Sequence, residues 1–449
     1  MSGTARNAHV DLLVIGGGMA GLSAAARTAD GGGSVVLVEK GETTGGSARF
    51  AGFAWTAPTL DEMRRVNPDG DPELAAALLD GFPEGIDWIR SLGVECKPAV
   101  PVLGYGRGHQ FDTDHYLDSC ERLIRDRGGE VLTGTETRAL LVEDGAVKGA
   151  ECVRPDGSVR RIEAGQTLLA TGGFQGDSDL LARHIHAQAP DMELRANPYS
   201  RGDGLRLGLA AGGAFGKEDA GFYGHLMPWG VPLNDSSRFV DLALYYSEHA
   251  LLFNIEGERF VDETVGDHLN TIALVEQPQA RGLLIADARV RREWITTPYV
   301  EGTPAIDKLE LCRRAGARVA VAGDLAEFDL IPEEWGYPGA KIRDRIEQFN
   351  LRAAHGEDIT PPRALDRKPI NEPPFYVIET APAITYTFGG LLIDRAARVL
   401  SEHGDAVPGL LAAGADAGGL YRRAYAGGLA PALVFGLTAA KTALTEKTG

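Results

Sequence analysis

The stretch VDLLVIGGGMAGLSAAARTADGGGSVVLVEK at residues 10–40 decides the fold. Residues 10–15 are an apolar run that predicts a short buried strand, and a glycine-rich turn follows it. The small residues at 19–30 predict a helix, three glycines end that helix, and residues 34–38 predict a second strand. A strand, a helix and a second strand at this spacing predict a βαβ unit.

The turn of this unit, residues 16–21, fits the pattern G-x-G-x-x-G. Its first glycine permits the tight turn, its second lets the backbone approach a pyrophosphate, and its third permits close packing of helix on strand. Glu39 ends the second strand and can accept hydrogen bonds from a ribose. The residues expected at a dinucleotide are Gly16, Gly18, Met19, Ala20, Gly21, Glu39 and Lys40. The alternative is a glycine-rich turn that binds no ligand.

Length and composition exclude several classes of protein. The chain has 449 residues, for which two domains are expected, and its net charge of −18 disfavours nucleic acid and anionic membranes as partners. The four cysteines lack the spacing of zinc, iron–sulfur or haem sites, so no metal is expected. We find no signal peptide in MSGTARNAHVD and no stretch that could span a membrane. A cytoplasmic location is therefore expected.

The rest of the chain changes character twice. Residues 60–95 read as helical, residues 129–153 as a β-hairpin and residues 167–171 as a strand. Tryptophans, prolines and charged helical segments gather between about 220 and 370, and a strand at 410–413 and a helix at 430–444 close the chain. We predict an α/β fold in which a Rossmann-like domain, residues 1–220 and 371–449, carries an inserted α+β capping (substrate) domain at residues 221–370.

A segment near the C-terminus favours FAD over NAD. The strand LLAA at 410–413 is followed by Gly414 and Asp416, which resembles the flavoprotein segment whose aspartate binds the ribityl or pyrophosphate part of FAD. Gly428 then begins the last helix, whose first residues, Leu429 and Ala430, would bring its positive end to the flavin and stabilise the anionic reduced form. An ordinary turn or cap role is the alternative for Asp416.

Seven segments, in order along the chain, resemble the fumarate reductase/succinate dehydrogenase flavoprotein superfamily, in its branch of 3-ketosteroid dehydrogenases and tricarballylate dehydrogenase. They are VIGGGMAGLSAA (14–25), VEKGETTGGSA (38–48), ATGGF (170–174), RGDGLRLGLAAGG (201–213), GERFVDE (257–263), TFGGLLID (387–394) and AAGADAGGLYRRAYAGGLAPALVFG (412–436). The resemblance implies an FAD domain built from both ends of the chain with a capping domain between. It also implies contacts of FAD with Gly46, Ser47, Thr137, Thr171, Gly172 and Asp203. Covalently flavinylated members carry a histidine where Ala48 stands, so non-covalent FAD is expected.

The resemblance further implies that a hydride passes between flavin N5 and a substrate carbon while a second group handles the proton on the neighbouring carbon. The arginine that fumarate reductases use as proton donor falls on Asp267 or His268, and a surface role is the alternative for His268. Their carboxylate-binding histidine and arginine are replaced by Tyr386 and Tyr425, so fumarate and succinate are not expected as substrates. Tyr425 matches a tyrosine of ketosteroid dehydrogenases and can polarise a ketone oxygen.

We therefore predict an FAD-dependent α,β-dehydrogenase or ene-reductase that acts on a cyclic or steroid-like ketone, with an external electron acceptor or donor. Arg422 and Arg423 keep a carboxylic acid of the tricarballylate type open as the alternative substrate. The inserted domain also contains Phe222-Tyr223 and Tyr245-Tyr246, which either line an apolar pocket or belong to its core. A flavin monooxygenase is disfavoured because no second free-standing G-x-G-x-x-G is apparent, and a non-catalytic flavin-fold protein because the phosphate and ribose motifs are intact.

Overall fold

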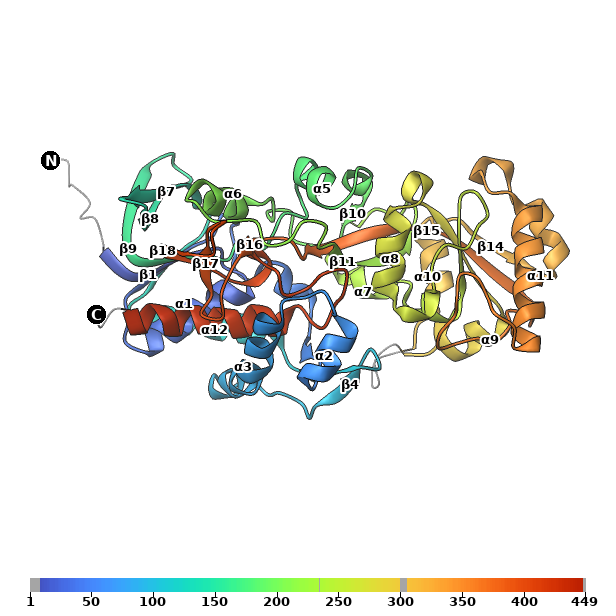
Figure 1. The fold of residues 1–449 in the computed structure, drawn as a ribbon, viewed down its shortest axis with the longest axis horizontal. Coiled ribbons are helices and arrows are strands. Elements are labelled where there is room, and N and C mark those ends of the chain that lie inside the picture. The colour runs from blue at the N-terminus through green and yellow to red at the C-terminus, as the bar shows by residue number, and fades with distance from the viewer. Residues whose placement is uncertain (1–8, 234, 299–304, 447–449) are drawn as a thin grey trace. The chain divides into compact units, whose positions relative to one another are not determined.

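The structure, a computed structural model, describes residues 9–233, 235–298 and 305–446 (Figure 1). The chain divides into a larger compact unit, Met1–Leu180, Ala196–Phe222 and Tyr386–Gly449, and a smaller one, Leu181–Arg195 and Tyr223–Thr385. The division into domains at 221–370 stays a prediction, and the region examined for a signal peptide lies largely outside the described residues. None of the helices in the described ranges has both the length and the apolar composition needed to cross a bilayer.

The βαβ unit predicted from residues 10–40 is the centre of the larger unit. It consists of β1 (His9–Ile15), α1 (Met19–Asp30) and β2 (Val35–Val38), with Leu12 opposite Val35 in parallel register. The main sheet has the order β17-β18-β9-β1-β2-β6 and is parallel from β18 to β6. Its other strands are β6 (Glu130–Leu132), β9 (Val159–Leu169), β17 (Arg398–Leu400) and β18 (Ala406–Ala412).

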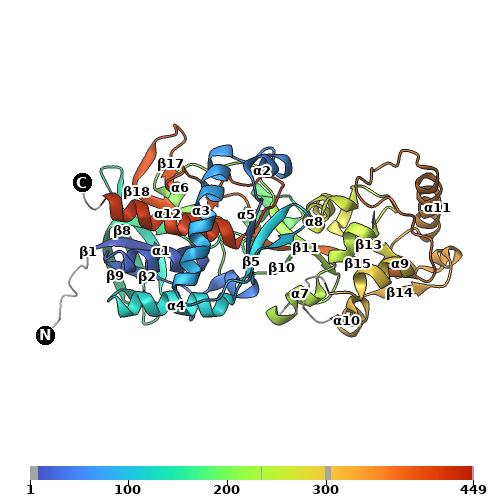
Figure 2. The ribbon, with the colours of Figure 1, turned by 90° about the horizontal axis from the view of Figure 1, so that it is seen from below.

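The predicted hairpin is also present, as β7 (Glu136–Glu143) and β8 (Ala146–Val153), and β8 continues the sheet by pairing with β9. The last helix, α12 (Leu429–Glu446), lies along α1 (Figures 1 and 2). A Cβ at Gly436 would lie 2.5 Å from the carbonyl oxygen of Ala20, so only glycine permits this approach. The C-terminal helix therefore packs directly on the helix of the G-x-G-x-x-G turn.

The segment read as one helical region, residues 60–95, forms two helices, α2 (Leu60–Val66) and α3 (Pro72–Ser91). The break has a local cause. Asp71 caps α3 by accepting hydrogen bonds from the N–H groups of Glu73 and Leu74, and Pro72 occupies the first turn. The other elements of this unit are β3 (Phe53–Thr56), β4 (Val100–Val102), β5 (Gly106–Gln110), α4 (Thr113–Asp126), α6 (Asp203–Ala210), β16 (Leu391–Leu392) and β19 (Ala417–Gly418).

The smaller unit is built on a second sheet of order β10-β15-β13-β12, in which β11 and β14 also pair with β15. The strands are β10 (Glu193–Leu194), β11 (Phe222–Pro228), β12 (Leu251–Asn254), β13 (Gly282–Ala286), β14 (Val319–Ala322) and β15 (Phe375–Thr387). Its helices include α7 (Phe239–Leu242), α8 (Asp267–Val275), α9 (Ala288–Val290), α10 (Lys308–Arg314) and α11 (Gly339–His355), and α5 (Ser178–His184) crosses the division between the units. Strands β12 and β13 are buried along their whole length and form part of its core.

Candidate active site

The G-x-G-x-x-G turn has a backbone that only glycine allows at two positions. Gly16 has a φ of +107°, and a Cβ there would lie 2.2 Å from the carbonyl oxygen of Ala170. A Cβ at Gly21 would lie 1.9 Å from the carbonyl oxygen of Gly16. Helix α1 then begins at Gly18 without a side-chain cap and without an acidic residue in its first turn. Its N–H groups and positive dipole end are therefore suited to an anion such as a phosphate.

Glu39 is hydrogen-bonded to the backbone of this turn. Its Oε2 accepts a hydrogen bond from the N–H of Gly17 at 2.7 Å, and its Oε1 accepts one from the N–H of Gly41 at 2.6 Å. The side chain is buried, so the carboxylate has one position. Each carboxylate oxygen can accept a further bond, which is compatible with the predicted contact to ribose hydroxyls.

The second glycine loop lies against the first. The N–H of Gly45 donates to the carbonyl of Gly17 at 2.7 Å, and Gly18 and Gly45 form a parallel bridge. Gly46 has a φ of +54°, and Ser47 Oγ accepts a hydrogen bond from the N–H of Asn197 at 3.0 Å. Two predicted cofactor residues that are distant from the first turn in sequence therefore lie beside it. Ala48, the next residue, is buried.

Asp416 connects two loops of the larger unit. Its carboxylate accepts hydrogen bonds from the N–H of Thr171 at 2.5 Å, from the Thr171 hydroxyl at 3.0 Å and from the N–H of Gly173 at 3.1 Å. Nearby, Gly414 with a φ of +68° approaches Ala20 in the first turn of α1. Asp416 is thus a link between loops. Whether it also contacts the cofactor stays a prediction.

Asp416→Asn is expected to lower the free energy of unfolding by about 2–4 kcal/mol, because an amide nitrogen would replace an acceptor where three donors converge. Urea unfolding of the purified protein measures this. Asp156→Asn is the matched control, since Asp156 lies on an exposed hairpin turn and accepts from the N–H of Ser158. Equal unfolding midpoints for the two variants would contradict the role of Asp416 as a link.

The other predicted cofactor residues have these positions. Lys40 forms ion pairs with Asp203 at 3.0 Å and with Glu136 at 3.3 Å. Thr137 lies in β7, and the start of this segment is tied to Glu39 by the Thr135 N–H, which donates to the Glu39 carbonyl at 2.9 Å. Gly172 has a φ of +95° in the loop that Asp416 holds, and Leu429 and Ala430 begin α12.

Six aromatic side chains gather around Gly427 in the larger unit, and we call them the aromatic cluster: Trp55, Tyr105, Tyr386, Phe388, Tyr421 and Tyr425. The Tyr425 ring lies edge-on to Trp55, with 5.2 Å between centroids, and 6.2 Å from the ring of Tyr386. The Tyr421 hydroxyl donates to the Gly427 carbonyl at 2.9 Å. The two tyrosines predicted from the sequence are therefore neighbours within the aromatic cluster.

Four members of the aromatic cluster, Trp55, Tyr105, Phe388 and Tyr421, were not predicted as site residues. Trp55 and Tyr105 come from β3 and from the loop before β5, and the Tyr105 hydroxyl donates to the Tyr425 carbonyl at 2.6 Å. A Cβ at Gly427, whose φ is +100°, would lie 1.9 Å from the Trp55 carbonyl oxygen. Tyr421 stands in the same motif as Tyr425, and this proximity in sequence is a signal that could have found it. No such signal exists for Trp55 and Tyr105.

Arg423, a candidate for binding a substrate carboxylate, is paired with a carboxylate of the protein itself. Its guanidinium pairs with Asp219 at 3.3 Å on the surface, and its backbone, with a φ of +47°, donates to the Ala220 carbonyl at 2.7 Å. The N–H of Arg422 donates to Asn67 Oδ1 at 3.2 Å. The Arg423 guanidinium is thus engaged by a carboxylate of the protein, whereas Arg422 is bonded here through its main chain.

The smaller unit contains the two candidates for the proton-handling group. Both Asp267 and His268 are buried at the start of α8, so His268 is not a surface residue. Burial lowers the pKa of His268 to about 3, which keeps its ring neutral. Asp267 lies 2.7 Å from Nδ1 of His225, a histidine that was not predicted as a site residue. Tyr223 and Tyr245 lie edge-on to the ring of His225.

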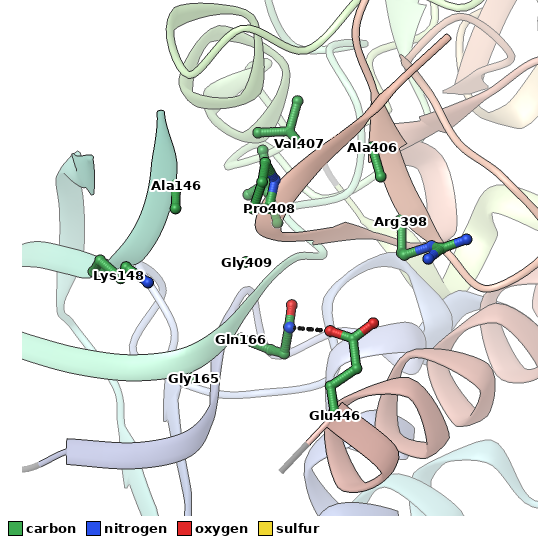
Figure 3. A pocket seen from close by; sticks show the side chains of 11 residues that line it. Ala146, Lys148, Gly165, Gln166, Arg398, Ala406, Val407, Pro408, Gly409 and Glu446 are labelled. Carbon is green, nitrogen blue, oxygen red and sulfur yellow. Dashed lines mark hydrogen bonds between the residues drawn. The ribbon is translucent and has the colours of Figure 1, made fainter. Parts of the chain in front are cut away.

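A hollow of about 370 Å³ lies elsewhere in the larger unit (Figure 3). It is lined by Ala146, Lys148, Gly165, Gln166, Arg398, Ala406, Val407, Pro408, Gly409, Leu410 and Glu446. At its edge the amide of Gln166 donates a hydrogen bond to Glu446 at 2.5 Å. None of its lining residues is a predicted site residue, so we assign it no part in the chemistry.

Comparison with known proteins identifies the cofactor of this chain. The family model of the FAD binding domain matches residues 11–429. The chain belongs to this family. The match covers both glycine loops and the aromatic cluster, and it confirms the predicted cofactor, FAD, together with the predicted flavoprotein superfamily.

Relatives of this FAD binding domain protein match it over nearly its whole length. Fumarate reductase (cytochrome) of Shewanella frigidimarina is 27% identical over 97% of this chain and 77% of its own. Vinyl phenol reductase of Lactiplantibacillus plantarum is 26% identical over 94% and 92%. The structure of 3-ketosteroid delta1-dehydrogenase from Sterolibacterium denitrificans has a TM-score of 0.77 at 18% identity, over 97% and 100%, which shows a shared fold. An FAD-dependent oxidoreductase acting on C=C or CH–CH groups is thereby confirmed.

The residues present fit FAD. The turn at residues 16–21 has the backbone and the uncapped helix end that a pyrophosphate needs, and Glu39 is fixed at its edge. The second glycine loop and Gly414 approach the same turn from distant parts of the chain. Three segments that are distant in the sequence therefore meet at this turn, and each contributes a glycine where it approaches the others closely. Such a site suits an elongated dinucleotide.

Proposed function

We propose that this protein binds FAD non-covalently and oxidises or reduces the bond between the two carbons next to the carbonyl of a cyclic or steroid-like ketone. The larger unit holds FAD, and the smaller unit is the capping unit that recognises the substrate. When bound, FAD supplies the oxidant or reductant by accepting or giving a hydride at its flavin ring. Ala48 supports non-covalent binding, because its side chain offers no atom for a covalent bond to the flavin.

The aromatic cluster is the observation that supports a ketone as the substrate. It holds Tyr425 and Tyr386 among other aromatic rings, which are suited to contact with a flat apolar molecule. The Tyr425 hydroxyl donates a hydrogen bond to the ketone oxygen and stabilises the negative charge that develops there when the neighbouring C–H bond breaks. Vinyl phenol, named in one relative, is also a ring compound without a carboxylate, which supports this class of substrate.

An anaerobic absorbance titration of the flavin-loaded protein tests the proposal. The panel is a 3-ketosteroid, cyclohexanone, succinate and tricarballylate. We expect a ketone to bleach the flavin band, or the matching enone to reoxidise protein reduced with dithionite. Reaction with an acid alone would contradict the ketone proposal, and reaction with none of these compounds would contradict the substrate class.

Arg423→Gln separates the two substrate classes. Because the guanidinium is already paired with Asp219, we expect kcat/KM for a ketone to change less than about threefold. If the substrate is instead a carboxylic acid held by this side chain, KM will rise by about 10²-fold or more, as expected for the loss of a charge-assisted pair. Steady-state kinetics with both substrate classes distinguish the two results.

A further inference from the structure

A buried carboxylate–imidazole pair in the smaller unit has the geometry of an acid–base dyad. Nδ1 of His225, in β11, lies 2.7 Å from Oδ2 of Asp267, the first residue of α8. The two residues are only 4% and 5% exposed. Oδ1 of Asp267 accepts hydrogen bonds from the Ser247 hydroxyl at 3.2 Å and from the Leu226 N–H at 3.4 Å. These two hydrogen bonds fix the position of the Asp267 carboxylate that contacts the imidazole.

The imidazole ring is oriented as well. Tyr223 and Tyr245 lie edge-on to it, with centroids 4.8 Å and 5.1 Å away. Since Nδ1 is directed at Asp267, Nε2 is the ring nitrogen that this contact leaves for proton exchange. Within the described ranges no residue makes a hydrogen bond to Nε2 of His225.

We propose that His225 exchanges the substrate proton through Nε2 and that Asp267 is a positioning residue that holds the ring through Nδ1. This inference rests on the proposed function and replaces the choice between Asp267 and His268. In oxidation, the C–H bond beside the carbonyl breaks and its proton passes to Nε2. Its electron pair enters the new C=C bond, and bound oxidised FAD would take up the hydride lost from the neighbouring carbon. In reduction, Nε2–H returns a proton to the same carbon, to which bound reduced FAD would contribute a hydride at the neighbouring position.

Burial and nearby charges change the pKa values of both residues of the pair. Burial lowers the pKa of His225 well below its usual value, and the nearby cations Arg195 and Lys308 act in the same direction. Burial raises the pKa of Asp267 to about 7. One proton therefore titrates on the pair as a unit near neutral pH.

The added proton changes the role of Nε2. Above about pH 7, ionised Asp267 accepts the Nδ1–H of a neutral His225, and the lone pair of Nε2 is a base. Below that pH, the pair holds two hydrogens, one between Oδ2 and Nδ1 and one on Nε2, so Nε2 is an acid. The rate of substrate oxidation should therefore rise with pH through this range, and the rate of reduction should fall.

Other titratable groups face the pair. Burial, and then the charge of Asp267, raise the pKa of Glu248 in the segment Tyr245–His249 to about 7, so Glu248 titrates in the same range. Burial raises the pKa of Tyr245, which stays protonated, and His268 stays neutral. Glu248→Gln is thus the control that assigns the transition.

Single-turnover reduction of the flavin, followed anaerobically against pH with the panel compound that reacts, tests the role of the pair. We expect His225→Asn to lower the rate by about 10²-fold and to remove the pH transition. Asp267→Asn should lower the rate by about tenfold and move the transition. Glu248→Gln should keep it, and His355→Asn, at the exposed end of α11, should match the wild type. Flavin absorbance and thermal unfolding confirm that each variant is folded.

Three outcomes would contradict the proposal. If His225→Asn keeps the rate within threefold, or if His268→Asn rather than His225→Asn removes the transition, the proposal is wrong. A transition that disappears in Glu248→Gln while it persists in Asp267→Asn would also overturn it.

A spectroscopic readout separates this inference from the proposed function. In protein labelled with 15N-histidine, the Nδ1–H that donates to a buried carboxylate gives a far-downfield proton signal, which needs no substrate. We expect it in the wild type and in His268→Asn but not in His225→Asn. Its absence from the wild type would contradict the pair. A wild type that shows the signal and reacts only with an acid would contradict the ketone substrate alone.

Discussion

Gly16→Val is expected to abolish flavin binding and to lower the free energy of unfolding by at least about 3 kcal/mol. The φ of +107° is unfavourable for any residue with a side chain, at a cost of roughly 1–2 kcal/mol. In addition, the new Cβ would lie 2.2 Å from the Ala170 carbonyl oxygen, a backbone atom that cannot rotate away. The strand end and the turn would have to separate, and the pyrophosphate position would be lost.

Gly32→Ala is the matched control for this variant. Gly32 also has a positive φ, +79°, but nothing lies within 4 Å of a Cβ placed there. We expect a loss of about 1 kcal/mol and unchanged flavin content. Flavin absorbance after gel filtration and urea unfolding measure both quantities. If Gly16→Val retained bound flavin at the level of Gly32→Ala, the turn would not be the pyrophosphate site.

Tyr425→Phe is expected to lower kcat for a ketone by about 10²–10³-fold with FAD still bound. The substitution keeps the ring that lies edge-on to Trp55, and it keeps the Tyr425 main-chain carbonyl to which Tyr105 donates. It removes only the hydroxyl assigned to the ketone oxygen. Because the hydroxyl acts on charge that develops during the reaction, kcat should fall far more than KM rises.

Tyr421→Phe is the comparison within the same cluster. Its hydroxyl is already bonded to the Gly427 carbonyl at 2.9 Å, so its loss should cost about 1 kcal/mol of unfolding free energy. We expect kcat to stay within about fivefold of the wild type. Rapid-reaction kinetics of flavin reduction, with binding titrated separately, measure these values. A larger fall in kcat for Tyr421→Phe than for Tyr425→Phe would move the oxyanion role to Tyr421.

Local patterns were sufficient for the FAD-binding part of the fold. The βαβ unit, the hairpin and the closing strand and helix form where the sequence predicts them, because each depends on neighbours a few residues away. The break between α2 and α3 was missed although its signal, Asp71 followed by Pro72, is present in the sequence. Here a local capping signal outweighed the apolar pattern that continues across the break.

Contacts between distant segments could not be predicted in the same way. His225 was not considered because nothing near it in sequence marks it, and its partner Asp267 lies on another element. Trp55 and Tyr105 join Tyr425 only because β3 and β5 pair beside Gly427. The three donors to Asp416 likewise come from residues more than two hundred positions away in the chain.

The sequence by itself determined the cofactor and the architecture around it. Backbone conformations that only glycine adopts, and an acid at the end of a strand, are properties of single positions and can be read without coordinates. Only the tertiary structure decided which side chains share a site. It turned Arg423 towards Asp219, gathered the aromatic cluster and joined His225 to Asp267. These outcomes depend on the packing of strands and helices that are far apart in the chain, and no local pattern encodes that packing.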